Sequence, residues 1–181
     1  MQPIRFSALL FAAGLAAFAA DAVPPKTDLD LELLTPIDQK ASAADQQISF
    51  KTARDAKKDN AVIVRKGAPV VARVTQMQKQ SSYIRNVKRN YFIVGIKLVS
   101  IDMGSGPVPI TGTLETILPT ASNDYFAPLS RGPDKWGAFQ EYRFQFHFPD
   151  PTPGESFLGA VQEYLRVPKG LRLVFRTPDE Q

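Results

Sequence analysis

Apolar and polar residues alternate in short runs along most of this chain, and this alternation limits the fold more than any other feature. In LDLELL, leucines occupy every second position from Leu29 to Leu33, and in YFIVGIKLVSI apolar residues do so from Phe92 to Leu98. Successive side chains of a β-strand point to opposite faces, so each run predicts a strand with one buried face. The pattern recurs, with varying strength, in the runs at 46–54, 61–77, 108–118, 141–148 and 171–176. We therefore expect a mainly β fold.

One late segment has helical spacing instead. Thr152, Pro153 and Glu155 have the spacing of a capping box with Pro at the first helical position. Apolar residues follow at helical intervals, at Phe157, Leu158, Val161 and Leu165. Pro168 and Gly170 would end the helix. We predict a small β-barrel or barrel-like sandwich with one short C-terminal α-helix that plugs or covers one end and packs its apolar stripe on the core.

The N-terminal residues 1–22 read as a signal peptide. One Arg at position 5 precedes an apolar run from Phe6 to Phe18, which is shorter than the roughly 20 residues that a transmembrane helix needs. Small residues then allow cleavage after Ala19 or Ala22. A buried N-terminal helix or a membrane anchor is the alternative. We expect an exported protein, periplasmic or secreted, in which residues 23–181 form a single β-rich domain.

The chain contains no cysteine, although export often accompanies disulfides in small domains. About 160 residues would remain after cleavage, enough for one domain to bury roughly 70% of its unfolded surface without such cross-links. The missing cysteines exclude thiol nucleophiles, thiolate metal sites and disulfide redox chemistry.

Two short stretches resemble one another. VRKGAPVVA, from Val64, and VPKGLRLVF, from Val167, each place a basic residue and a glycine ahead of an apolar strand. Glycine supplies the positive φ of a tight corner, and the neighbouring lysine stays in water. Because the device occurs twice, Lys66-Gly67 is interpreted mainly as a structural corner and not as an active site.

The order of strands and turns over residues 29–118 resembles a pattern in small exported bacterial proteins of unknown function. More distantly, it is similar to the C-terminal β-domain of TrbI-like conjugation proteins of type IV secretion channels. Those proteins have a Pro-Lys-Gly corner, which Pro168-Lys169-Gly170 matches and Arg65-Lys66-Gly67 matches without the proline, and a turn that SGPVPITG at 105–112 matches loosely. The resemblance implies a β-barrel located in the cell envelope.

Residue types that usually carry catalysis are sparse. His147 is the single histidine and alternates with Phe146 and Phe148, so it is expected to face water, and no metal ion or cofactor is predicted. No Gly-x-Ser-x-Gly elbow is present. The GSG at 104–106 lacks the Lys-Ser/Thr of a phosphate-binding loop and lies between strands. We therefore name no catalytic residue.

Carboxylates leave more than one interpretation open. Asp28, Asp30 and Glu32 share one strand face and could hold Ca²⁺ or act as an acid–base pair, but alternation alone predicts a solvated polar face. A glycosidase-like pair could also come from separated positions, which include Asp38, Glu115 and Glu141. The sequence does not select among them.

Positive charge is concentrated in one region. Residues 51–97 hold twelve Lys or Arg and two Asp, a net charge of +10, whereas the whole chain has +4. Its densest part interleaves Tyr83 and Tyr91 with cations, and the candidate anion-binding residues are Lys79, Arg85, Lys88 and Arg89. They could meet phosphates of lipid headgroups, lipopolysaccharide or nucleic acid. Alternatively, these charges decorate solvent-facing strand positions and pair with the acidic strand at 28–32.

A long segment at 119–140 is rich in Pro, Gly, Asn and Asp, and it holds the single tryptophan. Long connections of this kind are often lids or binding loops. Its aromatic candidates for partner binding are Tyr125, Phe126, Trp136 and Phe139. They could instead tuck over an open end of the barrel as a satellite core.

These features favour a non-catalytic, exported cell-envelope domain that binds or assembles with anionic envelope components or a protein partner. Peripheral contact with a membrane is compatible with this prediction. The alternatives are a hydrolase of an envelope polymer that uses a carboxylate pair and, more weakly, a nucleic-acid-binding protein, which export disfavours.

Overall fold

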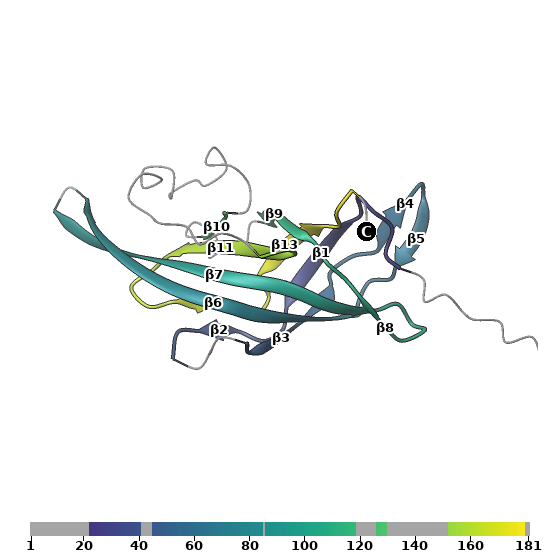
Figure 1. The fold of residues 1–181 in the computed structure, drawn as a ribbon, viewed down its shortest axis with the longest axis horizontal. Coiled ribbons are helices and arrows are strands. Elements are labelled where there is room, and N and C mark those ends of the chain that lie inside the picture. The colour runs from purple at the N-terminus through teal and green to yellow at the C-terminus, as the bar shows by residue number, and fades with distance from the viewer. Residues whose placement is uncertain (1–21, 41–44, 85, 119–125, 130–151, 180–181) are drawn as a thin grey trace, which may run out of the picture.

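A computed structural model describes residues 22–40, 45–84, 86–118, 126–129 and 152–179 of the 181-residue chain. This part of the chain is built from β-strands (Figure 1). In chain order they are β1 (Asp28–Leu33), β2 (Ile37–Asp38), β3 (Gln47–Thr52), β4 (Ala56–Lys58), β5 (Ala61–Val64), β6 (Pro69–Ile84), β7 (Val87–Asp102), β8 (Pro107–Pro109), β9 (Thr113–Leu118), β10 (Phe126–Pro128), β11 (Glu155–Val161), β12 (Arg166–Val167) and β13 (Arg172–Arg176). No helix in these residues is long and apolar enough to cross a bilayer.

The main sheet is a nearly closed barrel. Its strands follow the order β10-β11-β7-β6-β3-β1-β13-β9, all neighbours are antiparallel, and β8 pairs with β7. A side chain joins the two sides of the remaining gap, because Ser156 Oγ on β11 accepts the Leu114 N–H at 2.9 Å and donates to the Gly112 carbonyl at 3.3 Å. The prediction of a mainly β, barrel-like fold is confirmed.

The alternating runs form the barrel core. Leu29, Leu31 and Leu33 are fully buried, as are the alternate residues from Phe92 to Leu98. The middle of β7 is buried on its other face as well, which alternation did not indicate. That face carries a second apolar cluster of Tyr91, Ile93, Ala127, Leu129 and Phe157.

The predicted C-terminal helix is wrong. Residues 155–161 form β11, which pairs with β7 along its whole length. The strand is buried on both faces, and a continuous apolar run of this kind cannot be told from a helix by periodicity. The Thr152 N–H does donate to the Glu155 carboxylate, as in a capping box, but the Glu155 N–H donates to the Thr152 carbonyl and not to its hydroxyl. Gly154 has a φ of 77°, which no right-handed helix accepts. The contacts belong to a turn that leads into a strand.

Both Lys-Gly stretches are corners, as predicted. Gly67 and Gly170 have φ values of 86° and 88°. Each glycine N–H donates to the carbonyl at the end of a neighbouring strand, Gly67 to Thr52 and Gly170 to Leu33, at 2.8 Å in both cases.

These corners belong to two copies of one arrangement. β3 leads to β4, which pairs with β5, and the first corner then starts β6 against β3. β1 likewise leads to β2, which pairs with β12, and the second corner starts β13 against β1. The copies meet antiparallel at Lys51 and Glu32, which form an ion pair of 3.2 Å. The weak sequence similarity between the corners therefore reflects a local pseudo-two-fold arrangement.

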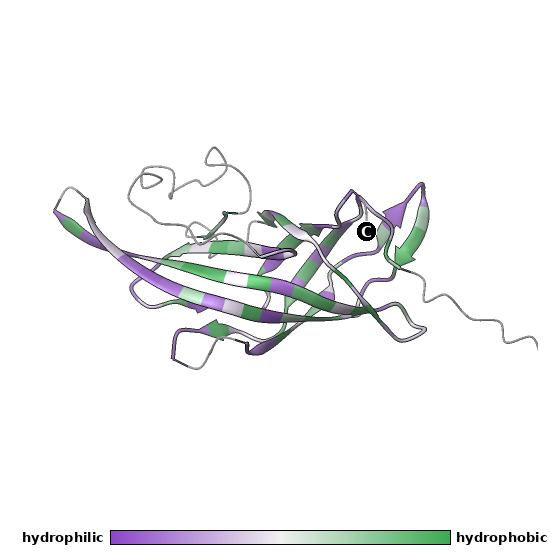
Figure 2. Cartoon of the chain, viewed as in Figure 1, coloured by the Kyte–Doolittle hydropathy of each residue, from purple (hydrophilic) through white to green (hydrophobic). Residues whose placement is uncertain are grey.

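β6 and β7 continue past the barrel as a two-stranded arm. β3 leaves β6 at Arg73, and β11 leaves β7 at Tyr91, so beyond these points the described rungs join β6 and β7 to each other. We define the arm as residues 79–84 and 86–90; it projects from the barrel in Figure 1. Figure 2 shows β7 largely hydrophobic within the barrel and β6 largely hydrophilic towards the arm.

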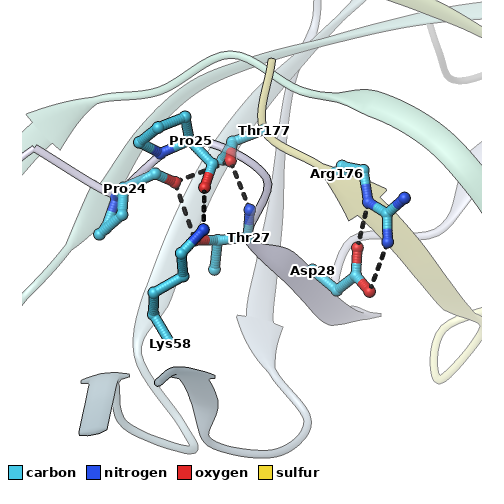
Figure 3. A network of polar contacts seen from close by, with 7 residues as sticks. All are labelled: Pro24, Pro25, Thr27, Asp28, Lys58, Arg176 and Thr177. Carbon is cyan, nitrogen blue, oxygen red and sulfur yellow. Dashed lines mark hydrogen bonds and ion pairs between the residues drawn. The ribbon is translucent and has the colours of Figure 1, made fainter. Parts of the chain in front are cut away.

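A polar strap joins the ends of the described chain (Figure 3). The Thr27 N–H donates to Thr177 Oγ1 at 2.8 Å, and both threonine hydroxyls donate to the Pro24 carbonyl at 2.8 Å. Lys58 Nζ adds a bond of 2.9 Å to the Pro25 carbonyl. Residues 24–27 are thereby held against the segment that follows β13.

Candidate functional site

The base of the arm carries an open groove with a volume of about 710 Å³. This volume is within the range of small-molecule sites. One wall comes from the arm and the other from β11 and the loop that follows it. The lining residues are Lys79, Lys88, Arg89, Asn90, Val161, Gln162, Glu163 and Tyr164.

Asn90 fixes the two walls relative to each other. Its Nδ2 donates to the Glu163 carbonyl at 3.0 Å, its carbonyl accepts the Gln162 N–H at 3.3 Å, and its Oδ1 accepts the Ser81 hydroxyl at 2.8 Å. Gln162 Oε1 in turn accepts the Arg166 N–H at 2.7 Å, which closes the loop. The groove is thus preorganised by one side chain that bonds to both sides.

Three of the four predicted anion-binding residues line this groove. Lys79, on β6, places its Nζ 5.8 Å from the centroid of the Phe92 ring, a cation–π distance. Lys88 and Arg89 come from β7 and are exposed. In the described residues, none of the three cations has a carboxylate within ion-pair distance. The fourth candidate, Arg85, lies outside the described residues.

The aromatic candidates are only partly placed. Phe126 is half-buried on β10 and packs against the main core. It stands in one row of the sheet with Ala160, Phe92 and Lys79. Tyr125, Trp136 and Phe139 lie outside the described residues. Tyr164, which the sequence analysis did not select, is 64% exposed at the groove.

The acidic face of β1 is only partly solvated, although alternation suggested a solvated face throughout: Asp28 is exposed and Glu32 is half-buried, but Asp30 is buried. The side chain of Asp30 is fully buried and receives Arg172, with Nε at 3.1 Å, and Arg54, also at 3.1 Å. Its hydrogen bond to Asp30 raises the pKa of Arg172 above the ordinary value. Asp28 pairs with Arg176, and Glu32 with Lys51. Cross-strand pairing explains these acids. Lys51 and Arg54 come from the basic region 51–97, as the alternative interpretation of that region expected, and Arg172 and Arg176 come from β13; none of the four belongs to the arm.

Of the other carboxylate and histidine candidates, the two that the structure describes, Asp38 and Glu115, are not among the lining residues of the groove. Asp38 lies on β2, where it accepts the Lys40 N–H at 2.7 Å, and Glu115 lies on β9. Glu141 and His147 lie outside the described residues. Within the parts of the chain that are described, no cluster of three potential metal ligands occurs.

Glu155, which was predicted only as part of a helix-capping box, is a carboxylate that is only 7% exposed. Burial would raise its pKa, but hydrogen bonds from Gln76, Thr75 and Thr152 outweigh burial, so the pKa lies below the usual 4.5. Gln76 Nε2 and the Thr152 N–H each lie 2.9 Å from the carboxylate. Its burial and full set of donors indicate a structural role, and it does not line the groove.

Comparisons with known proteins add little to this description. No protein-family model matches the sequence, and no curated protein matches it. Among solved structures, ComB10 of the Com type IV secretion system of Helicobacter pylori is similar over 87% of each chain, with a TM-score of 0.39 and 11% sequence identity. At this similarity the function has to be argued from the residues of this chain.

Proposed function

We propose that this protein is an exported, non-catalytic domain that binds phosphate groups of anionic cell-envelope lipids in the groove at the base of the arm. The observation that carries the proposal is that Lys79, Lys88 and Arg89 all line one groove, with no ion-pair partner among the described residues. Unpaired cations in a concave site concentrate anions. Phosphates are good ligands for such groups because Arg and Lys donate charge-assisted hydrogen bonds.

Tyr164 and Asn90 add selectivity to the charge. The exposed Tyr164 ring offers an apolar face beside the cations, which suits the glycerol or sugar part of a headgroup. Asn90 holds the loop of Tyr164 against the arm through the Glu163 carbonyl. A ligand would therefore bind a preformed site, and little conformational entropy would be lost on binding.

The hydrolase alternative is less well supported by this groove. Glycoside hydrolysis generally needs two carboxyl groups that flank the scissile bond. Among the described lining residues Glu163 is the single acid, whereas three of the others are cations. Binding of an anion is the chemistry that this composition favours.

Vesicle co-sedimentation tests the proposal. We expect the purified protein to bind phosphatidylglycerol vesicles, to ignore phosphatidylcholine vesicles, and to dissociate as salt rises. Each cation near an anionic surface contributes about 1 kcal/mol. Replacing Lys79, Lys88 and Arg89 together by Ala is therefore expected to weaken binding on the order of a hundredfold.

A charge-matched control separates the groove from net charge. Lys57, Arg65 and Lys66 are three exposed cations around the β4–β5 hairpin and the first corner. Their triple Ala variant should retain most of the binding. An equal loss in both triples would overturn the proposal, as would equal binding to neutral vesicles. A parallel titration with soluble glycerol phosphate distinguishes a site for free phosphates from one that needs a lipid surface.

A further inference from the structure

The end of the arm has a composition that differs from its stem. Tyr83 and Val87 are 73% and 50% exposed, and they are two of the few large apolar side chains that the described chain leaves in solvent. The stem behind them is polar, with Gln80, Ser81 and Asn90. Two of the five large apolar side chains that are exposed among the described residues, including the most exposed one, thus lie next to the turn at the end of the arm.

Strand register orders these groups along the arm. Val87 pairs with Ile84 at the last described rung, Tyr83 pairs with Lys88 one rung back, and Arg89 pairs with Ser82 behind that. At about 3.3 Å per residue, the cations lie roughly 3–7 Å behind Val87. Because side chains alternate, Tyr83 and Lys88 share one face, whereas Val87 and Arg89 share the other.

This order matches the depth profile of a lipid interface. An aliphatic side chain enters the acyl boundary, tyrosine prefers the headgroup level, and Lys or Arg beside it reaches back to the phosphates. Interfacial elements bury their apolar groups about 5–10 Å deep. On one face of the arm Arg89 lies behind Val87, and on the other Tyr83 and Lys88 lie side by side on one rung. Each face thus combines an apolar with a basic side chain, which suits end-on entry and not a one-sided contact with a flat protein surface.

We propose that the tip of the arm, through Val87 and Tyr83, inserts into the interface of an anionic lipid bilayer, with Lys88 and Arg89 at the level of the phosphates. This inference rests on the proposed function and extends it: the groove supplies attraction to anionic headgroups, and the tip supplies penetration. The arm would thereby be the part through which the domain attaches to the membrane.

The absence of cysteine makes a direct test simple, because one introduced cysteine is a unique labelling site. In Val87→Cys, an environment-sensitive fluorophore should brighten severalfold and shift to the blue with phosphatidylglycerol vesicles. Nitroxide groups high on the acyl chains should quench it. The matched control is Val62→Cys, because Val62 is a 46% exposed valine on β5, in the β4–β5 hairpin, which also carries exposed cations. Its label should not respond.

A second variant tests the energetic role of the tip. Tyr83→Ser combined with Val87→Ser removes exposed side chains, so the melting temperature should not change. Vesicle affinity should fall at least about tenfold, given the apolar surface lost from the interface, while the dependence on salt stays as in the unmodified protein.

The outcomes separate the two proposals. If the protein co-sediments with anionic vesicles but the label at position 87 does not respond, insertion is wrong and anion binding stands. If that label responds equally to neutral vesicles, insertion stands and the anion-binding function fails. If the serine variant binds vesicles as tightly as the unmodified protein, the tip does not penetrate, and its exposed residues belong to contact with another protein.

Discussion

The hydroxyl of Thr75 donates a hydrogen bond to the buried carboxylate of Glu155, 80 positions later in the chain. Thr75 occupies a β-bulge of β6, between Val74 and Gln76, which directs its side chain across the sheet. Gly95, on β7 between these two strands, has no side chain and therefore leaves space for this hydrogen bond. A Cβ at Gly95 would lie 2.5 Å from Glu155 Oε1 and closer still to the Thr75 hydroxyl. Bulge, glycine and carboxylate thus form one unit that joins three strands below the arm.

Removing the charge of Glu155 should destabilise the fold in a pH-dependent way. Glu155→Gln loses the acceptor of the Thr152 contacts, and we expect a cost of about 1.5–3 kcal/mol at neutral pH. Because the folded pKa is below the unfolded value of 4.5, the stabilisation is complete above 4.5 and is lost as the pH falls through the folded pKa. Urea unfolding between pH 7 and 3 should show the two proteins converging towards acid.

The control for this series is Glu163→Gln, because Glu163 is exposed. It should change the free energy of unfolding by no more than about 0.5 kcal/mol. A gap between Glu155→Gln and the unmodified protein that stays constant from pH 7 to pH 3 would show that folding leaves the pKa of Glu155 unchanged, and a gap that widens towards acid would show that folding raises that pKa.

Filling the space at Gly95 should be as harmful as removing the carboxylate. Gly95→Ala forces Thr75, Glu155 or the backbone to move, and overpacking of this kind costs about 1–3 kcal/mol. Because the added methyl lies nearest to the Thr75 hydroxyl, Gly95→Ala and Thr75→Ala should be non-additive in a double-mutant cycle. Strict additivity would contradict the shared contact.

The two corners give a test of backbone strain alone. A Cβ at Gly67 or Gly170 would meet nothing within 4 Å, so each Gly→Ala change imposes a left-handed φ without a clash. We expect a loss of about 1–2 kcal/mol for each. The corners lie roughly 14 Å apart across three strand spacings. The loss of unfolding free energy in the double variant should therefore equal the sum of the two single losses. Lys66→Ala and Lys169→Ala should have little effect on unfolding, as controls.

Asp30 pairs with two arginines, and replacing each of them in turn compares the contribution of a partly buried ion pair with that of an exposed one. Arg172 bonds the carboxylate through two guanidinium nitrogens, whereas the side chain of Arg54 is 63% exposed. Arg172→Ala should therefore cost about 2 kcal/mol or more, because it leaves a buried charge poorly paired. Arg54→Ala should cost less than about 1 kcal/mol. Chemical denaturation of both variants decides this, and equal losses would mean that Arg54 is the main partner.

Alternation predicted the barrel strands well where one face is buried and the other is polar, as at Leu29–Leu33. It failed at β11, because a strand buried on both faces has no alternation, and its apolar residues also fit a helical stripe. The acids of β1 were read as solvated because sequence does not reveal that Arg172, 142 positions from Asp30, lies on the neighbouring strand. Such pairings depend on register, which no local pattern encodes.

The basic residues of the arm were found from charge density alone, and three of them share a groove. The opposite wall was not predictable, because Gln162 to Tyr164 lie in the segment that was expected to be helical. No local sequence pattern marked Tyr164 as a site residue, apart from its being an aromatic residue in a polar context. Knowing that 155–161 is a strand paired with β7 would have placed the following loop beside the arm.

The strap between Thr27 and Thr177 has a consequence for how this domain can be attached to anything else. The ends that it joins and the tip of the arm lie towards opposite ends of the long axis (Figure 1). Strands of 16 residues, such as β6 and β7, are about 50 Å long. The described ends of the chain, at residues 22 and 179, are therefore held away from the tip by about the length of one such strand, so that contacts made at these ends and at the tip would act on opposite poles of the domain.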